Sequence, residues 1–152
     1  MTAVDHDSPP LDQATRAAAR LSRVVETALD QVGLSLPQYR LMVLLGDGSS
    51  VATALARRLT VSRPSITALA DGLVDRGYVE RLPDPDDRRR VTHTLTPAGH
   101  TALAAGDEAI SARLDTVVAH LSPRQRRTAV DGLALWLQAL DLHRATQEAT
   151  PA

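Results

Sequence analysis

Residues 52–96 read ATALARRLTVSRPSITALADGLVDRGYVERLPDPDDRRRVTHTLT, which combines two short helical patterns with two strand patterns. Apolar side chains recur at helical spacing over residues 52–59 and again over residues 62–76. Only the connection 60–62 separates the two runs, and Ser62 is a favourable N-cap for the second. Two helices joined by such a short turn predict a helix-turn-helix.

Two predicted strands follow the second helix. Residues 78–82 favour extended structure, and residues 91–96 alternate larger side chains with threonines. Between them, residues 83–90 read PDPDDRRR, in which two prolines and three aspartates make a poor strand and a good exposed hairpin tip. A hairpin placed directly after a helix-turn-helix predicts a wing.

Helical periodicity dominates both flanks of this region. The further predicted helices cover residues 11–32, 36–45, 97–121 and 123–144. The tail after Arg144 is small and polar, and we expect it to fray. The long apolar faces at both chain ends have no sheet to cover them, and an intertwined dimer would bury more of them than packing within one chain.

The predicted organisation is a mainly α (α+β) fold in three parts. Residues 1–10 are acidic and proline-containing and form a disordered tail. Residues 37–96 form a winged helix-turn-helix domain. Residues 11–36 and 97–146, the N- and C-terminal helices, form a dimerisation domain.

Composition narrows the chemistry. The 152 residues contain no cysteine, which excludes a disulfide framework and a thiolate zinc site, and the five histidines show no tight metal-ligand spacing. We therefore expect no metal site and no cofactor, and no motif of an enzyme is present. No apolar run approaches the roughly 18 residues of a membrane span, and the first ten residues lack the apolar core of a signal peptide, so we expect a cytoplasmic protein.

Apart from histidine, every basic side chain is an arginine, because the chain contains no lysine. Residues 37–96 hold nine arginines against seven acidic residues, whereas the whole chain has a net charge of −1. This asymmetry is modest and would not by itself predict a polyanionic partner. Any contact to a phosphate or a base must still come from a planar guanidinium, which can bond bidentately.

Several segments, in this order and at this spacing, resemble the MarR family of winged helix-turn-helix transcription regulators. They are LARRL at Leu55–Leu59, VSRPSIT at Val61–Thr67, LVDRGYVER at Leu73–Arg81, DRR at Asp87–Arg89 and LTPAG at Leu95–Gly99. The resemblance spans about residues 11–142. It implies a homodimer that binds a pseudo-palindromic operator in double-stranded DNA, and a repressor that a small apolar or phenolic ligand releases.

The resemblance places four candidate DNA-binding residues at the start of the recognition helix. They are Ser62, Arg63, Ser65 and Thr67, which are polar groups in the turns that reach base edges. An arginine such as Arg63 can bond a guanine bidentately. The alternatives are that Ser62 only caps the helix and that Arg63 only touches phosphate.

The wing supplies the second group of candidates: Asp87, Arg88, Arg89 and Arg90. Arg89 matches the wing-tip arginine of the family, and an arginine on a narrow tip suits the electronegative minor groove. We expect Asp87 to hold the Arg89 guanidinium in place, and Arg88 and Arg90 to face phosphates. The alternative is a solvated charge run.

Two further arginines and two departures from the family bear on DNA contact. Arg57 and Arg58 either reach backbone phosphates or only complement the dipole at the end of their helix. Ala68 and Gly72 stand where many relatives carry basic residues. Base contacts from this helix are therefore expected to be sparse, with more reliance on the wing and on DNA shape.

A ligand pocket is implied where the dimerisation helices meet the winged domain. Its candidate lining is Leu21, Tyr39, Arg40 and Met42, although these residues would also suit a plain core with Arg40 solvated. Two other functions stay open for the same fold. One is a protein-interaction or structural module that binds DNA weakly, and the other is a metal-sensing regulator.

Overall fold

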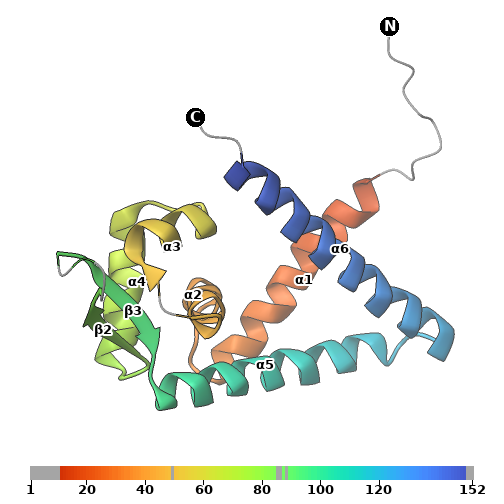
Figure 1. Cartoon of the computed structure of the whole chain (residues 1–152). Coiled ribbons are helices and arrows are strands. Elements are labelled where there is room, and N and C mark those ends of the chain that lie inside the picture. Colours follow the sequence, from red (N-terminus) through yellow and green to blue (C-terminus); the bar gives the residue numbers. More distant parts are fainter. Residues whose placement is uncertain (1–10, 49, 85–86, 88, 150–152) are drawn as a thin grey trace, which may run out of the picture. The chain divides into compact units, whose positions relative to one another are not determined.

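The computed structural model describes residues 11–48, 50–84, 87 and 89–149 (Figure 1). The described part of the chain folds into helices with a small antiparallel sheet, which confirms the predicted fold class. The elements are α1 (Asp12–Gln31), α2 (Leu36–Gly46), β1 (Ser50–Val51), α3 (Ala52–Leu59), α4 (Arg63–Asp75), β2 (Val79–Pro83), β3 (Val91–Leu95), α5 (Pro97–Val118) and α6 (Pro123–Ala149). The predicted tail at residues 1–10 lies outside the described residues.

Two features of the secondary structure differ from the sequence-based prediction. Helix α6 continues to Ala149, so the expectation that the chain frays after Arg144 is wrong. The wing is a sheet with the strand order β1-β3-β2 rather than a hairpin alone. Strand β1 spans only two residues, Ser50 and Val51, which is too short to leave a periodic signal in the sequence.

The chain divides into two compact units between Arg113 and Leu114. The first unit contains α1 to α4, the sheet and most of α5, and the second contains the end of α5 and all of α6. The functional division that we predict, with a winged domain at residues 37–96, remains a prediction.

One apolar cluster lies beneath the helix-turn-helix and the sheet. Leucine is its most frequent residue, and its fully buried members come from α1, α2, α3, α4, β2 and the connection between α1 and α2. They include Leu29, Leu34, Leu41, Met42, Leu45, Leu55, Ile66, Leu73 and Val79. Burial of this kind contributes about 25 cal/mol for each Å² of apolar surface, so the cluster holds α4 and the sheet on a common support.

Candidate nucleic-acid interface

Helix α4 has one buried face and one polar exposed face. Ile66, Ala70 and Leu73 are buried against the core. The helix begins after Ser62, whose Oγ accepts a hydrogen bond from the backbone N–H of Ser65 at 3.2 Å. The capping role proposed for Ser62 is therefore confirmed, and such a cap is typically worth about 1 kcal/mol.

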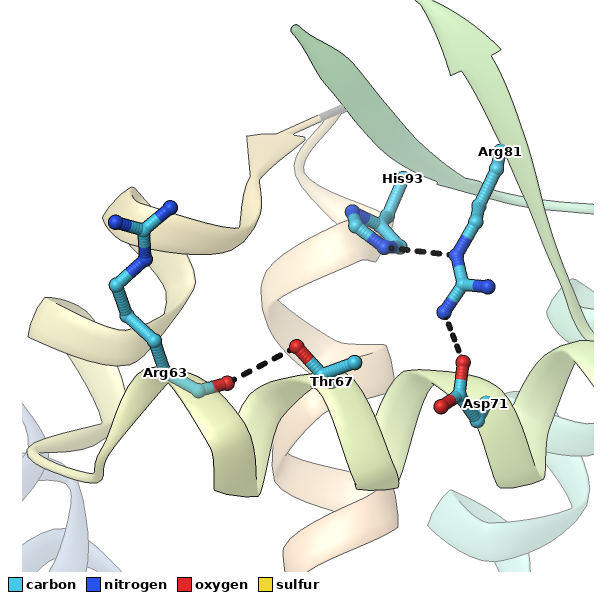
Figure 2. A network of polar contacts seen from close by, with 5 residues as sticks. All are labelled: Arg63, Thr67, Asp71, Arg81 and His93. Carbon is cyan, nitrogen blue, oxygen red and sulfur yellow. Dashed lines mark hydrogen bonds and ion pairs between the residues drawn. The ribbon is translucent and has the colours of Figure 1, made fainter.

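The other predicted recognition residues lie on the exposed side of α4. Arg63, Ser65 and Thr67 are all exposed. The hydroxyl of Thr67 donates to the carbonyl oxygen of Arg63 at 3.1 Å, and the Ser65 and Ser62 hydroxyls lie 2.7 Å apart. The hydroxyls are thus tied to their own helix, and the Arg63 guanidinium has the longest reach of the set (Figure 2).

The described part of the wing tip is organised by a carboxylate. Oδ1 of Asp87 accepts from the backbone N–H of Arg89 at 3.0 Å, and Oδ2 lies 3.4 Å from Nε of Arg90. The carboxylate thus reaches the backbone two residues on and the side chain three residues on, and the expectation that it holds the Arg89 guanidinium remains a prediction. Arg89 is exposed, and the predicted contact Arg88 lies outside the described residues.

The two arginines at the end of α3 lie in different environments. Arg57 is exposed, whereas the side chain of Arg58 is only 25% exposed and lies 3.8 Å from the carboxylate of Asp47. Both residues stand in the last turn of α3, where a cation complements the helix dipole. The ion pair with Asp47 favours this structural role for Arg58, and phosphate contact stays a prediction for Arg57.

A polar network that the sequence analysis missed joins the recognition helix to the sheet (Figure 2). Asp71 of α4 forms a short ion pair with Nη2 of Arg81 on β2. Nε of Arg81 donates to Nε2 of His93 on β3 at 3.4 Å. Arg81 and His93 are register partners, so strand pairing could have indicated their contact. Nothing in the sequence pattern indicated the link to Asp71.

The imidazole of His93 is nearly inaccessible, at 5% exposure. Its Nδ1 is buried without a hydrogen-bond partner among the described residues. Burial, reinforced by the Arg81 guanidinium, lowers the pKa of His93 below its ordinary value of 6.5. The neutral imidazole is therefore the form that the folded chain favours.

This burial predicts a pH dependence of stability. Because the pKa of His93 is lower in the folded chain than in the unfolded chain, its stabilising contribution is complete above the ordinary pKa of 6.5 and is lost as pH falls through the lowered value. One proton limits the slope to about 1.4 kcal/mol per pH unit. Urea unfolding should show a steeper loss of stability below pH 6.5 for the wild type than for His93→Gln. If the stability of the two proteins fell equally with decreasing pH, the predicted contribution of His93 would be contradicted.

A second arginine connects the end of α4 to the end of α1. Nη1 of Arg76 donates to the carbonyl oxygen of Gly33 at 2.6 Å, and Nη2 donates to the hydroxyl of Tyr78 at 3.2 Å. The guanidinium carbon also lies 4.6 Å from the centroid of the Tyr78 ring, within the range of a cation–π contact. Gly33 follows α1, so this contact couples the recognition helix to the first helix of the chain.

The four candidate ligand-pocket residues differ in their surroundings. Met42 is completely buried in the core, Arg40 is exposed, and Leu21 is half-buried on α1. The hydroxyl of Tyr39 donates to Oδ1 of Asp107 on α5 at 2.6 Å. Burial and this hydrogen bond raise the pKa of Tyr39, so its hydroxyl stays protonated as a donor. Met42 and Tyr39 thus hold structural positions, and a pocket stays a prediction.

Comparison with known proteins agrees with the winged helix-turn-helix geometry described above. A model of the MarR family matches residues 32–90. An HTH-type transcriptional regulator of Mycobacterium bovis is 31% identical over 132 residues, which cover 84% of this chain and 92% of the relative. The chain belongs to the MarR family. Members of this family are transcriptional regulators, not enzymes.

A further relative is similar in sequence, and two solved structures are similar in fold. The HTH-type transcriptional repressor YetL of Bacillus subtilis is 32% identical over 87 residues, covering 55% of this chain and 52% of the relative. The apo structure of wild-type MarR from E. coli superposes with a TM-score of 0.73 at 21% identity, covering 89% of this chain and 98% of the other. The repressor CouR bound to a 23-mer DNA duplex superposes with a TM-score of 0.66 at 23% identity, covering 87% and 99%.

Among the described residues, none of the helices has an apolar stretch that could span a bilayer. Within the same residues, no three histidine, aspartate or glutamate side chains are grouped so that they could hold a metal ion.

Proposed function

We propose that this chain is a cytoplasmic, homodimeric repressor that binds a pseudo-palindromic operator through α4 and the wing. The observation that carries the proposal is the exposed polar face of α4, with Arg63 near its start. Arg81 ties this helix to the sheet, and exposed Arg89 lies in the connection between β2 and β3. A helix of this kind suits the major groove, and an arginine on a narrow tip suits the minor groove beside it.

The apolar surface of α6 supports a dimer. Seven large apolar side chains are exposed along this helix: Val130, Leu133, Leu135, Trp136, Leu137, Leu140 and Leu142. Surfaces of this extent on a soluble chain commonly mark an interface. A second copy would bring two recognition helices to two half-sites about 34 Å apart, one helical turn of DNA.

The DNA-binding proposal is tested by enriching duplexes from a randomised library with the full chain. We expect an inverted repeat whose half-sites are centred about one helical turn apart, with A·T-rich flanks where the wings contact the minor groove. Fluorescence anisotropy with the enriched duplex then provides the binding assay. Failure to enrich any sequence over random DNA would overturn sequence-specific binding.

The dimer is tested independently of DNA. The mass of one chain is 16.3 kDa, and sedimentation equilibrium of the full chain at micromolar concentration should give twice that mass. A single species at the mass of one chain would contradict the dimer and with it the expectation of an inverted repeat.

The proposal also includes repression of transcription and release of the protein from DNA by a ligand. The relative YetL is a transcriptional repressor, and a small molecule could release such a regulator from DNA by changing the spacing of the recognition helices. A panel of phenolic and apolar carboxylic acids should include a compound that lowers DNA affinity in the anisotropy assay. A panel without effect on binding would argue for a regulator that does not respond to this class of ligand.

A further inference from the structure

Helix α4 carries an acidic residue on the side that faces DNA in the proposed function. Figure 2 shows Arg63, Thr67 and Asp71 spaced along the same side of α4. Residues four apart share a helix face, so Asp71 stands in line with the two predicted contacts. A carboxylate on that side repels the phosphate backbone, and its presence there needs a physical explanation.

The ion pair with Arg81 neutralises Asp71, but it is a weak source of folding stability. The side chains of Arg81 and Asp71 are 37% and 50% exposed. Ion pairs at such positions are screened by water and typically contribute less than about 1 kcal/mol. The value of this pair therefore lies in the geometry that it imposes on the guanidinium.

The other contact of Arg81 fixes that geometry. Nε donates to Nε2 of His93, which is 5% exposed and held in the middle of the sheet by pairing with β1 and β2. One end of the planar guanidinium is thus anchored to a rigid strand, and the other end holds the helix. The chain Asp71–Arg81–His93 links α4, β2 and β3 (Figure 2).

We propose that Arg81 is a positioning residue that sets the angle between the recognition helix and the wing, and that Asp71 is its required partner on the helix. The inference rests on the proposed function, because it assigns the network to DNA recognition by that same surface. A fixed angle lets Arg63 and Arg89 reach neighbouring grooves together, without an ordering cost at the moment of binding.

The sign of the effect of Asp71→Asn separates positioning from simple electrostatics. The substitution removes a negative charge from the DNA-facing side of α4, so electrostatics alone predicts tighter binding. Positioning predicts weaker binding, by about tenfold for a coupled contact pair in one network. Arg81→Gln should weaken binding similarly, and the double variant should bind no more weakly than either single variant. Asp71→Asn binding as tightly as the wild type, or more tightly, would overturn the inference.

Arg81→Lys distinguishes positioning from a direct phosphate contact. Lysine keeps the charge but lacks the planar fork that engages Asp71 and His93 together. We expect Arg81→Lys to remain about as weak as Arg81→Gln, with the salt dependence of binding unchanged in both. Restored affinity in Arg81→Lys, with a shallower salt dependence in Arg81→Gln, would show that Arg81 contacts phosphate and would overturn its positioning role.

The matched control is Asp75→Asn, on the same helix. Asp75 is exposed and has no ion pair with any described residue, so its loss should leave DNA affinity unchanged or slightly increase it. Urea unfolding shows whether each variant is folded. If the Arg81 variants do not fold, the DNA affinity of Asp71→Asn alone tests the positioning role. If the wild type binds the enriched duplex and Arg89→Ala weakens binding, but Asp71→Asn does not, the inference fails and the proposed function stands. A wild type that binds no duplex overturns both.

Discussion

Arg89→Ala is expected to weaken binding to the enriched duplex at least thirtyfold, which makes it the largest single effect on DNA affinity. A lost arginine contact costs about 1–3 kcal/mol, and a dimer loses two of them, so the lower bound of about 2 kcal/mol corresponds to roughly a thirtyfold change in Kd. Arg89 is exposed, and its backbone N–H is held by Asp87. Because the side chain of Arg89 lies outside the core, we expect its removal to leave the fold intact.

The measurement is anisotropy titration at several salt concentrations. Arg89→Ala should also show a shallower dependence of log Kd on log salt, because a cation near phosphates is removed. Arg20→Ala is the matched control, since it removes the same charge from an exposed position on α1, away from α4 and the wing. Equal affinity for Arg89→Ala and wild type would remove the wing from DNA recognition.

Local physics was sufficient to predict most of the fold. The helical spacing of Leu55, Leu59, Ile66 and Leu73 identified two helices, and all four side chains are buried. Ser62 was predicted as a cap because its oxygen can reach the free N–H groups of the next turn, and it does so. These signals depend only on neighbours a few residues apart in the chain.

The features that were missed depend on contacts between distant segments. Strand β1 exists because Ser50 pairs with His93, and two residues carry no pattern of their own. Asp71 meets Arg81 because α4 packs across β2, which no spacing within either element reveals.

Gly99→Ala is expected to cause the largest loss of folding stability, about 3 kcal/mol, at the upper end of the cost of overpacking. A Cβ at Gly99 would lie 2.0 Å from the carbonyl oxygen of Tyr78, far closer than two such atoms approach. The motif LTPAG, which the resemblance identified by pattern, thus has a steric reason for its glycine. Urea unfolding of wild type and variant at equal protein concentration measures the loss.

The size of the effect follows from how firmly the Tyr78 backbone is held. Its N–H donates to the carbonyl oxygen of Leu73 at 2.9 Å, and its own carbonyl oxygen accepts from the N–H of Thr96 at 3.0 Å. Moving the carbonyl away from a new methyl group would break the bond to Thr96 and loosen the junction of α4, the sheet and α5.

A second glycine provides the control for Gly99→Ala, because it differs in the space around it. Gly72 lies inside α4, and a Cβ there would make only ordinary contact, at 3.6 Å, with the flexible side chain of Gln38. Gly72→Ala should therefore raise stability by about 0.5–1 kcal/mol, as alanine does inside a helix. A loss of stability in Gly99→Ala together with a gain in Gly72→Ala would show that the carbonyl of Tyr78 leaves no room for a side chain at Gly99. A Gly99→Ala protein that unfolds at the wild-type midpoint would show that the start of α5 can move aside, and that its position does not depend on the glycine.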